Sequence, residues 1–279
     1  MYRRPIVVGN WKMQTQVADA ILLARRISHA AEQLDDVDIV LLPPVIWLPS
    51  ILEDLHHRPR SLQFGVQNFY PKDSGAYTGE IGLKMIEKLV HFVLIGHSER
   101  RTIFQESDGL INEKVQAALG AKLRPIVCVG ELTKVMLRQR DRGRPTLAEK
   151  QSNVLRQLRS ALQGLHERDI EHLVVCYEPL WAIGMGENVP GSHVQAILEQ
   201  FRQLIVVQFG RQAAQRVRML YGGSVTPNDI ASYVRQPDID GVLVGGASLK
   251  ADSFLQIVEA VMQHTEAAHV SGGLRIENV

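Results

Sequence analysis

A carboxylate at the end of an apolar run is the feature of this sequence with the clearest chemical meaning. Glu178 directly follows the run 173–177, and Pro179, Trp181 and Gly184 come after it. A carboxylate at the tip of a buried strand, beside a loop able to close over it, is typical of a general base in a dry site. Taken alone, the pattern fits equally well a glutamate that caps a turn before Pro179. The possible partners of Glu178 decide between these interpretations.

Side chains able to support such a base follow other apolar runs. Asn10 and Lys12 come after the first run, and His97 follows the fourth. Ser98 predicts a helix N-cap, so we expect His97 at a helix start, where the positive helix end disfavours the imidazolium. A neutral imidazole there can donate a proton to a carbonyl oxygen. The alternatives are a polar residue satisfied at a strand end for His97 and a plain surface lysine for Lys12.

Two glycine pairs follow the seventh and eighth apolar runs. They are Gly222-Gly223, with Ser224 after it, and Gly245-Gly246. Both precede helical patterns, so backbone amides and a helix N-terminus would favour an anion there. Phosphate sites in barrels often follow strands seven and eight. Plain tight turns are the alternative, and the two pairs together favour phosphate.

Eight short apolar runs, separated by segments of helical periodicity, position these side chains. Segments 17–33 and 192–209 place apolar residues three and four positions apart, as half-buried helices do. Eight such alternating units, with no antiparallel block left over, predict an α/β protein with a closed parallel (β/α)8 barrel and outer helices. The predicted strands are 6–9, 38–42, 62–67, 92–95, 125–129, 173–177, 218–221 and 241–244.

The composition predicts one soluble domain. The 279 residues are 45% hydrophobic and 22% charged, and the net charge of +1 gives no electrostatic case for nucleic acid. No apolar stretch is long enough for a membrane span, and the N-terminal apolar run is too short for a signal-peptide core. The two cysteines, which lie in apolar runs, predict reduced thiols in a cytoplasmic protein. We predict a catalytic barrel over residues 1–264 and a mobile tail over 265–279. The basic segment 132–147 predicts a solvated loop or helix end, with an anion-binding patch as the alternative.

Neither a metal site nor a dinucleotide fingerprint is predicted. No residues have metal-ligand spacing, and no Gly-x-Gly-x-x-Gly opens a strand–helix turn. Cys128 and Cys176 lie inside apolar runs, which predicts buried, reduced thiols; a cysteine nucleophile paired with a histidine is the alternative. The residues therefore favour cofactor-free proton transfer on a small phosphorylated carbonyl compound.

At these residues the sequence closely resembles the triosephosphate isomerase family. Six blocks occur in family order from the first strand to the eighth, and together they are highly specific. The resemblance covers all but the tail and implies a TIM barrel. The blocks are residues 9–13, 96–101, 128–131, 177–184, 221–224 and 244–248.

The resemblance implies catalytic roles for four residues. Glu178 would carry a proton between neighbouring carbons of dihydroxyacetone phosphate and glyceraldehyde 3-phosphate, through an enediolate. Neutral His97 would move protons between the two oxygens, while Lys12 and Asn10 stabilise the developing negative charge.

It also implies binding and supporting residues. Ile183 and Leu243 would form an apolar clamp that removes water from the base when a lid closes. Glu99 matches a family carboxylate near the lysine, and Thr78 would reach the active site of a partner subunit, which implies a homodimer. The phosphate would be held by the backbone amides of Gly184, Ser224, Gly245 and Gly246.

One departure and two other functions stay open. The family's lid usually continues Gly-Thr-Gly-Lys-Thr-Ala, whereas residues 184–189 read Gly-Met-Gly-Glu-Asn-Val, which puts the closing kinetics in doubt. The resemblance implies an enzyme of glycolysis and gluconeogenesis. The first alternative is a related isomerase that acts on a tetrulose phosphate in a roomier pocket. A non-catalytic barrel that binds phosphorylated metabolites is the other, although a binder needs no aligned acid and base.

Overall fold

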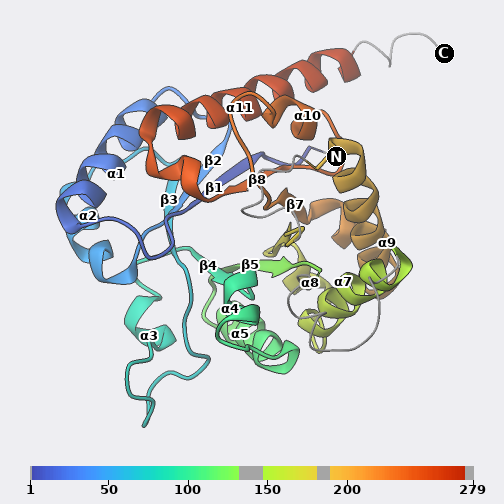
Figure 1. The fold of residues 1–279 in the computed structure, drawn as a ribbon, viewed down its shortest axis with the longest axis horizontal. Helices are drawn as coiled ribbons and strands as arrows, with labels where there is room; N and C mark the ends of the chain where they lie inside the picture. The colour runs from blue at the N-terminus through green and yellow to red at the C-terminus, as the bar shows by residue number, and fades with distance from the viewer. Residues whose placement is uncertain (1, 132–146, 181–188, 274–279) are drawn as a thin grey trace.

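A closed barrel of eight parallel strands forms the centre of the computed structural model, which describes residues 2–131, 147–180 and 189–273, with side chains placed except at 147–152 and 265–273. The strands pair in chain order, and β1 closes the ring against β8 (Figure 1). The predicted (β/α)8 fold is therefore confirmed. The strands are β1 Ile6–Asn10, β2 Asp38–Leu42, β3 Leu62–Val66, β4 Phe92–Ile95, β5 Arg124–Val129, β6 Val174–Tyr177, β7 Arg218–Tyr221 and β8 Gly241–Val244.

Helices surround the barrel and cover its outer face (Figure 1). Among the described residues they are α1 Val17–Ala31, η1 Val45–Trp47, α2 Leu48–Asp54, α3 Leu83–Ile86, α4 Ser98–Thr102, α5 Asp108–Gly120, α7 Leu147–Ala161, α8 Glu167–Ile170, α9 Gly191–Arg216, α10 Ile230–Val234, η2 Gly246–Leu249 and α11 Ala251–Gly273. No helix of this described part is long and apolar enough to cross a membrane.

Each strand contributes to two apolar layers, because successive side chains point to opposite faces. In β1, Ile6 and Val8 belong to the cluster that fills the barrel, whereas Val7 packs in the larger cluster between strands and helices. Burial on both faces explains why the strands read as continuous apolar runs. The barrel is thus a filled core, and chemistry is confined to its ends.

The predicted boundaries differ from the structure mainly in the helices. Helix α9 runs past the predicted end at residue 209 to Arg216, with a break at Gly210, whose φ is +86°. Helix α11 continues to Gly273, so the predicted division at residue 264 falls inside a helix. The mobility expected for the tail stays a prediction, and segment 132–146 lies outside the described residues.

Ion pairs close the amino-terminal end of the barrel beside β1, β2, β7 and β8. Asp38 accepts from Arg4 Nε and from Arg218 Nη1, at 2.6 Å in both cases. Asp240 accepts from Arg3 Nε at 2.7 Å and from the Met219 backbone N–H at 2.8 Å. Both oxygens of each carboxylate are therefore occupied at this end.

Candidate active site

Three predicted catalytic residues come together at the carboxyl-terminal end of the barrel. Asn10 ends β1, His97 follows β4 and Glu178 follows β6, and all three are buried. His97 Nε2 lies 3.2 Å from Glu178 Oε1, although 81 positions separate the two residues in the sequence. The barrel thus brings the predicted acid and base into direct contact.

The two oxygens of Glu178 have different environments. Oε2 accepts a hydrogen bond of 2.8 Å from the Ser98 backbone N–H. Oε1 is buried and makes no hydrogen bond with a described residue, and its contact with His97 lacks hydrogen-bond geometry. Since buried polar atoms are nearly always paired, an oxygen without a described partner in a residue that is 1% exposed is the environment expected of a general base.

His97 is the N-cap of α4, which corrects the prediction that Ser98 is the cap. Its Nδ1 accepts from the Glu99 backbone N–H at 3.3 Å, so Nδ1 carries no proton and the ring proton resides on Nε2. The Glu99 carboxylate is farther from Nδ1, at 3.6 Å. The expected position at a helix start is confirmed, and Nε2 is the ring nitrogen that faces Glu178.

Lys12 has a constrained backbone, with a φ of +53° that non-glycine residues rarely adopt. Its N–H donates to Asn10 Oδ1 at 3.0 Å, and its carbonyl accepts from Gln67 Nε2 at 2.8 Å. The same amide group donates to the Leu42 carbonyl at 2.9 Å. The ammonium donates to Glu99 Oε1 at 2.7 Å, so a cation is held beside His97.

Gln67 is a site residue to which the sequence reasoning gave no role. It was placed in the third strand, but that strand ends at Val66, so Gln67 belongs to the polar residues that follow strand ends. The signal was therefore present: an amide directly after a buried strand, at the end of the barrel where loops converge.

The glycine pairs approach the same residues. A Cβ on Gly222 would lie 2.6 Å from Cys176 Sγ and 3.0 Å from Glu178 Cγ, so glycine is required for the β7 loop to pass the base. A Cβ on Gly245 would lie 3.7 Å from Lys12 Cε. Helix α10 follows β7 but begins only at Ile230, well beyond the glycine pair, whereas the short η2 follows β8 at once. Backbone amides are therefore the main phosphate donors that these loops can offer.

The structure describes some of the other predicted residues and leaves others outside the described ranges. Leu243 is buried inside the barrel, and Thr78 is exposed in the segment between β3 and α3, which projects from the body (Figure 1). Ser224 and Gly246 are half-buried or exposed in their loops, and the Gly246 amide begins η2. Ile183, Gly184 and lid positions 185–188 lie outside the described residues.

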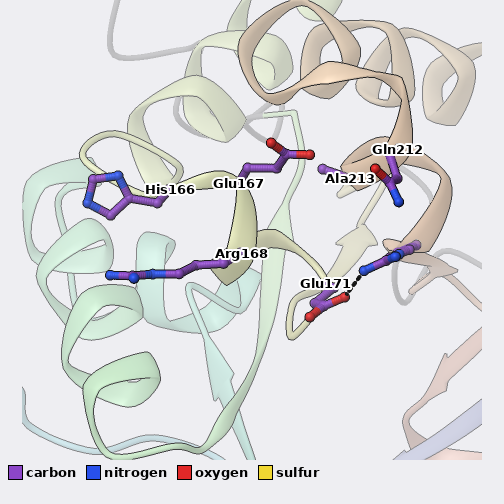
Figure 2. Close-up of a pocket in the computed structure, with 7 residues that line it drawn as sticks. His166, Glu167, Arg168, Glu171, Gln212 and Ala213 are labelled. Atoms are coloured by element: carbon purple, nitrogen blue, oxygen red, sulfur yellow. Dashed lines mark hydrogen bonds and ion pairs between the residues drawn. The ribbon is translucent and has the colours of Figure 1, made fainter.

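The catalytic end contains a cavity of about 190 Å³ whose lining includes Asn10, Lys12, His97 and Glu99. A larger cavity of about 550 Å³ lies between α8 and the end of α9 and contains the ion pair of Glu171 with Arg216 (Figure 2). The predicted site residues do not line that larger cavity. The smaller one combines a cation, a neutral imidazole and a nearby carboxylate, so it is the candidate active site.

The two thiols lie below the base inside the barrel. Cys128 and Cys176 are register partners on β5 and β6, and both are free and buried, as predicted. Burial raises the pKa of both thiols, and the charge of Glu178 raises it further. A thiol kept neutral is a poor nucleophile, which disfavours the cysteine-nucleophile alternative. The described residues contain no cluster of three or more potential metal ligands.

Comparison with known proteins agrees with this geometry. The family model described as Triosephosphate isomerase matches residues 5–261. The chain belongs to the triosephosphate isomerase family. A triosephosphate isomerase of Caldanaerobacter subterraneus is 40% identical over 257 residues, which cover 92% of this chain and 99% of that protein. Those of Syntrophotalea carbinolica and Roseiflexus castenholzii are 41% and 42% identical, each over 92% of this chain and 98% and 97% of the relative.

Triosephosphate isomerase family membership accounts for the six matched sequence blocks. It also agrees with the closed barrel, because the family match extends from just before β1 into α11. The part of the C-terminal helix beyond residue 261 lies outside the match. Family members with this name are aldose–ketose isomerases, a reaction class that requires a base and a proton donor on neighbouring atoms.

Proposed function

We propose that this protein interconverts dihydroxyacetone phosphate and glyceraldehyde 3-phosphate by proton transfer, without a metal or an organic cofactor. The observation that carries the proposal is the buried Glu178 Oε1, which makes no hydrogen bond with a described residue and lies 3.2 Å from His97 Nε2. Such a pair can act on a carbon and on its adjacent oxygen at the same time.

In the forward direction, Glu178 removes a proton from the carbon next to the substrate carbonyl. The carbonyl oxygen gains negative charge, and His97 Nε2–H donates to it, so that an enediolate or enediol forms. Glu178 then returns the proton to the neighbouring carbon, and the histidine exchanges protons with the two oxygens. The capping bond on Nδ1 supports this role because it keeps the donor proton on Nε2.

Lys12 supplies the positive charge for the developing oxyanion and for the substrate's phosphate. Its side chain is a third exposed and lines a cavity together with Asn10 and His97. Hydrogen bonds fix the Lys12 backbone, and the bond from its ammonium to Glu99 holds the side chain before the substrate arrives, so little reorganisation is needed. Asn10 keeps its side-chain amide nitrogen for a substrate oxygen, since its oxygen is already used.

The phosphate would bind at backbone amides of Gly184, Ser224, Gly245 and Gly246. Gly245, in the loop after β8, lies next to Lys12. Gly222, in the loop that also carries Ser224, lies next to Glu178, so both loops approach the reacting groups. Ile183 and Leu243 would exclude water above the base after closure.

A tetrulose-phosphate isomerase would use the same acid and base. The comparisons do not favour it, because the similar relatives are named triosephosphate isomerases over almost their full lengths. A barrel that only binds phosphorylated metabolites gains no support either: it would not need an unpaired carboxylate oxygen beside a neutral imidazole.

We further propose a cytoplasmic homodimer that serves glycolysis and gluconeogenesis. Met13 and Phe104 line the active-site cavity, yet they are 96% and 60% exposed in the single chain. Exposed apolar side chains at a site rim favour burial against a second subunit, with Thr78 on the projecting segment entering the partner's site. Light scattering tests the dimer, and a fully active monomer would contradict the role of Thr78.

A coupled assay tests the reaction itself. Purified protein, supplied with glyceraldehyde 3-phosphate and a dehydrogenase that consumes dihydroxyacetone phosphate, should turn over rapidly in the presence of a metal chelator. The parallel reaction contains a four-carbon ketose phosphate. Turnover of the four-carbon compound without turnover of the trioses would replace our proposal with the tetrulose-phosphate alternative. Binding of both without turnover would identify a non-catalytic barrel.

A further inference from the structure

At the amino-terminal end of the barrel, the side beside β3, β4 and β5 differs in its charges from the ion-paired side beside β1, β2, β7 and β8. The segments that lead into β3, β4 and β5 carry five cationic side chains, and none forms an ion pair with a described residue. Their strands are neighbours in the barrel, so these segments meet at one face. The five residues are Arg58, Arg60, Lys88, Lys122 and Arg124.

His91 lies at the centre of this face. Its N–H donates to the Phe64 carbonyl at 3.0 Å, and its own carbonyl accepts from the Arg124 N–H at 2.8 Å. The Arg58 guanidinium lies 5.6 Å from the centre of the Phe64 ring. Three potential cations are thus brought together by the pairing of β3, β4 and β5.

The two arginines are held by aromatic rings instead of carboxylates. Arg58 stacks on Phe64, and Arg124 lies 5.8 Å from the centre of the Phe92 ring. Such contacts restrict a guanidinium but leave its N–H donors and its positive charge uncompensated. This arrangement differs from that of Arg3, Arg4 and Arg218, whose donors are occupied by Asp240 and Asp38.

The electrostatics of His91 agree with a face that lacks anions. Partial burial, together with the charges of Arg58 and Arg124, lowers the pKa of His91. Carboxylates of the described residues do not contribute to that shift. The acidic residues close to these cations in the sequence, Asp54 and Glu87, form no ion pairs with them, and Asp54 pairs instead with Arg25. An anion bound here would therefore meet two fixed guanidinium groups and a histidine able to gain a proton.

We propose that this face binds a compact oligophosphate through Arg58, His91 and Arg124. Guanidinium forks match phosphate oxygens, and three adjacent parallel strands span about 10 Å, a length that suits two or three linked phosphates. A nucleic-acid duplex needs a wider basic surface, and the net charge of +1 does not favour one. The face lies at the opposite end of the barrel from the active site, so the binding is independent of the proposed catalysis.

Calorimetric titration of the whole protein with inorganic tripolyphosphate, in metal-free buffer, tests this site. We expect saturable binding that weakens with salt and a dissociation constant at least tenfold higher in the double variant Arg58→Gln/Arg124→Gln. The matched control is Arg211→Gln, which removes an exposed cation from the end of α9. Equal affinity of the double variant and the parent protein would overturn the proposal.

Two further measurements separate this site from the active site and identify the ligand's source. Triose-phosphate turnover should be unchanged in the double variant; if tripolyphosphate instead binds as a competitive inhibitor with equal strength in the parent protein and the variant, it binds at the catalytic end and the proposal is wrong. ATP that binds as tightly as tripolyphosphate points to a nucleotide, and tripolyphosphate alone points to free polyphosphate. Both results support the site.

Proton uptake gives a readout specific to His91. Near pH 6.5, binding should draw a proton onto His91, which is seen as a binding enthalpy that depends on the buffer's ionisation enthalpy. In His91→Asn that dependence should disappear while binding persists more weakly. Binding without proton uptake in the parent protein would exclude His91 from the site. If the double variant does not fold, the single variants Arg58→Gln and Arg124→Gln supply the affinity comparison.

Discussion

The buried carboxylates at the two ends of the barrel differ in how many of their oxygens are hydrogen-bonded. At the amino-terminal end, both oxygens of Asp38 are occupied by arginines, and Asp240 is bound by Arg3 and a backbone N–H. At the carboxyl-terminal end, one oxygen of Glu178 has no hydrogen bond with a described residue, and the nearby Lys12 has a positive φ. The same eight strands thus carry fully paired carboxylates at one end and, at the other, a buried carboxylate oxygen without a hydrogen bond to a described residue.

This difference separates stability from activity. A fully paired buried carboxylate cannot accept a substrate proton without losing its partners, and the loss of one partner from such a pair costs stability. An unpaired buried oxygen costs stability and is available for a proton. Substitutions at the two ends should therefore change different measurements.

The largest expected effect is on activity at the carboxyl-terminal end. Glu178→Gln should lower kcat by at least about a hundredfold, because the amide cannot take up a proton. The free energy of unfolding should change little, since a glutamine oxygen can still accept from the Ser98 N–H. The coupled assay and urea unfolding measure the two quantities. Glu171→Gln, at the exposed ion pair with Arg216, is the matched control. Intact turnover in Glu178→Gln would refute the mechanism.

The next effect is on stability at the other end. Asp38→Asn should reduce the free energy of unfolding by about 2 kcal/mol, because two partly buried arginines lose their carboxylate. Activity per folded molecule should stay unchanged. Asp252→Asn breaks an exposed pair with Arg26 and should cost less than about 0.5 kcal/mol in urea unfolding. A loss of activity in Asp38→Asn without loss of stability would mean that the two ends are coupled.

A smaller effect on activity is expected at Gln67, which positions Lys12. Gln67→Met removes the donor shared by the Lys12 and Leu42 carbonyls, so Lys12 should be held less firmly. We expect kcat/KM to fall roughly tenfold, the size of one lost hydrogen bond to a positioned group. Gln116→Met, which removes an exposed amide, should leave it unchanged. Steady-state kinetics measures both variants. Equal kcat/KM values for Gln67→Met and Gln116→Met would contradict this role of Gln67.

The barrel could be predicted from the sequence because the lengths of the apolar runs and the periodicity of the segments between them distinguish strands from helices. Short continuous apolar runs rich in β-branched residues are typical of strands buried on both faces, and their bounds were predicted to within about one residue. The site was only partly predictable. His97 and Glu178 could be found as polar residues at strand ends, but which Glu178 oxygen is paired depends on the Ser98 N–H, 80 positions away. The His97 cap failed for a related reason: serine is the commoner cap, and here the imidazole Nδ1 takes the bond.

The smallest effect concerns the thiols between the two ends. Burial and Glu178 raise the pKa of Cys128 and Cys176, so the native thiols stay neutral at pH values where an unfolded cysteine, with a pKa of about 8.5, ionises. Above that pH the unfolded state releases protons that the native state keeps, so stability falls as pH rises. Each thiol should contribute less than about 1 kcal/mol by pH 9, measured by urea unfolding between pH 7.5 and 9.

Cys176→Ala should reduce that slope, and both thiols of the parent protein should react with a disulfide reagent only as fast as the protein unfolds. A thiol that is labelled rapidly in the native protein would show that water reaches the floor below Glu178. In that case the dry environment assigned to the base would be wrong, and the contrast between the two ends would lie in their hydrogen bonds alone.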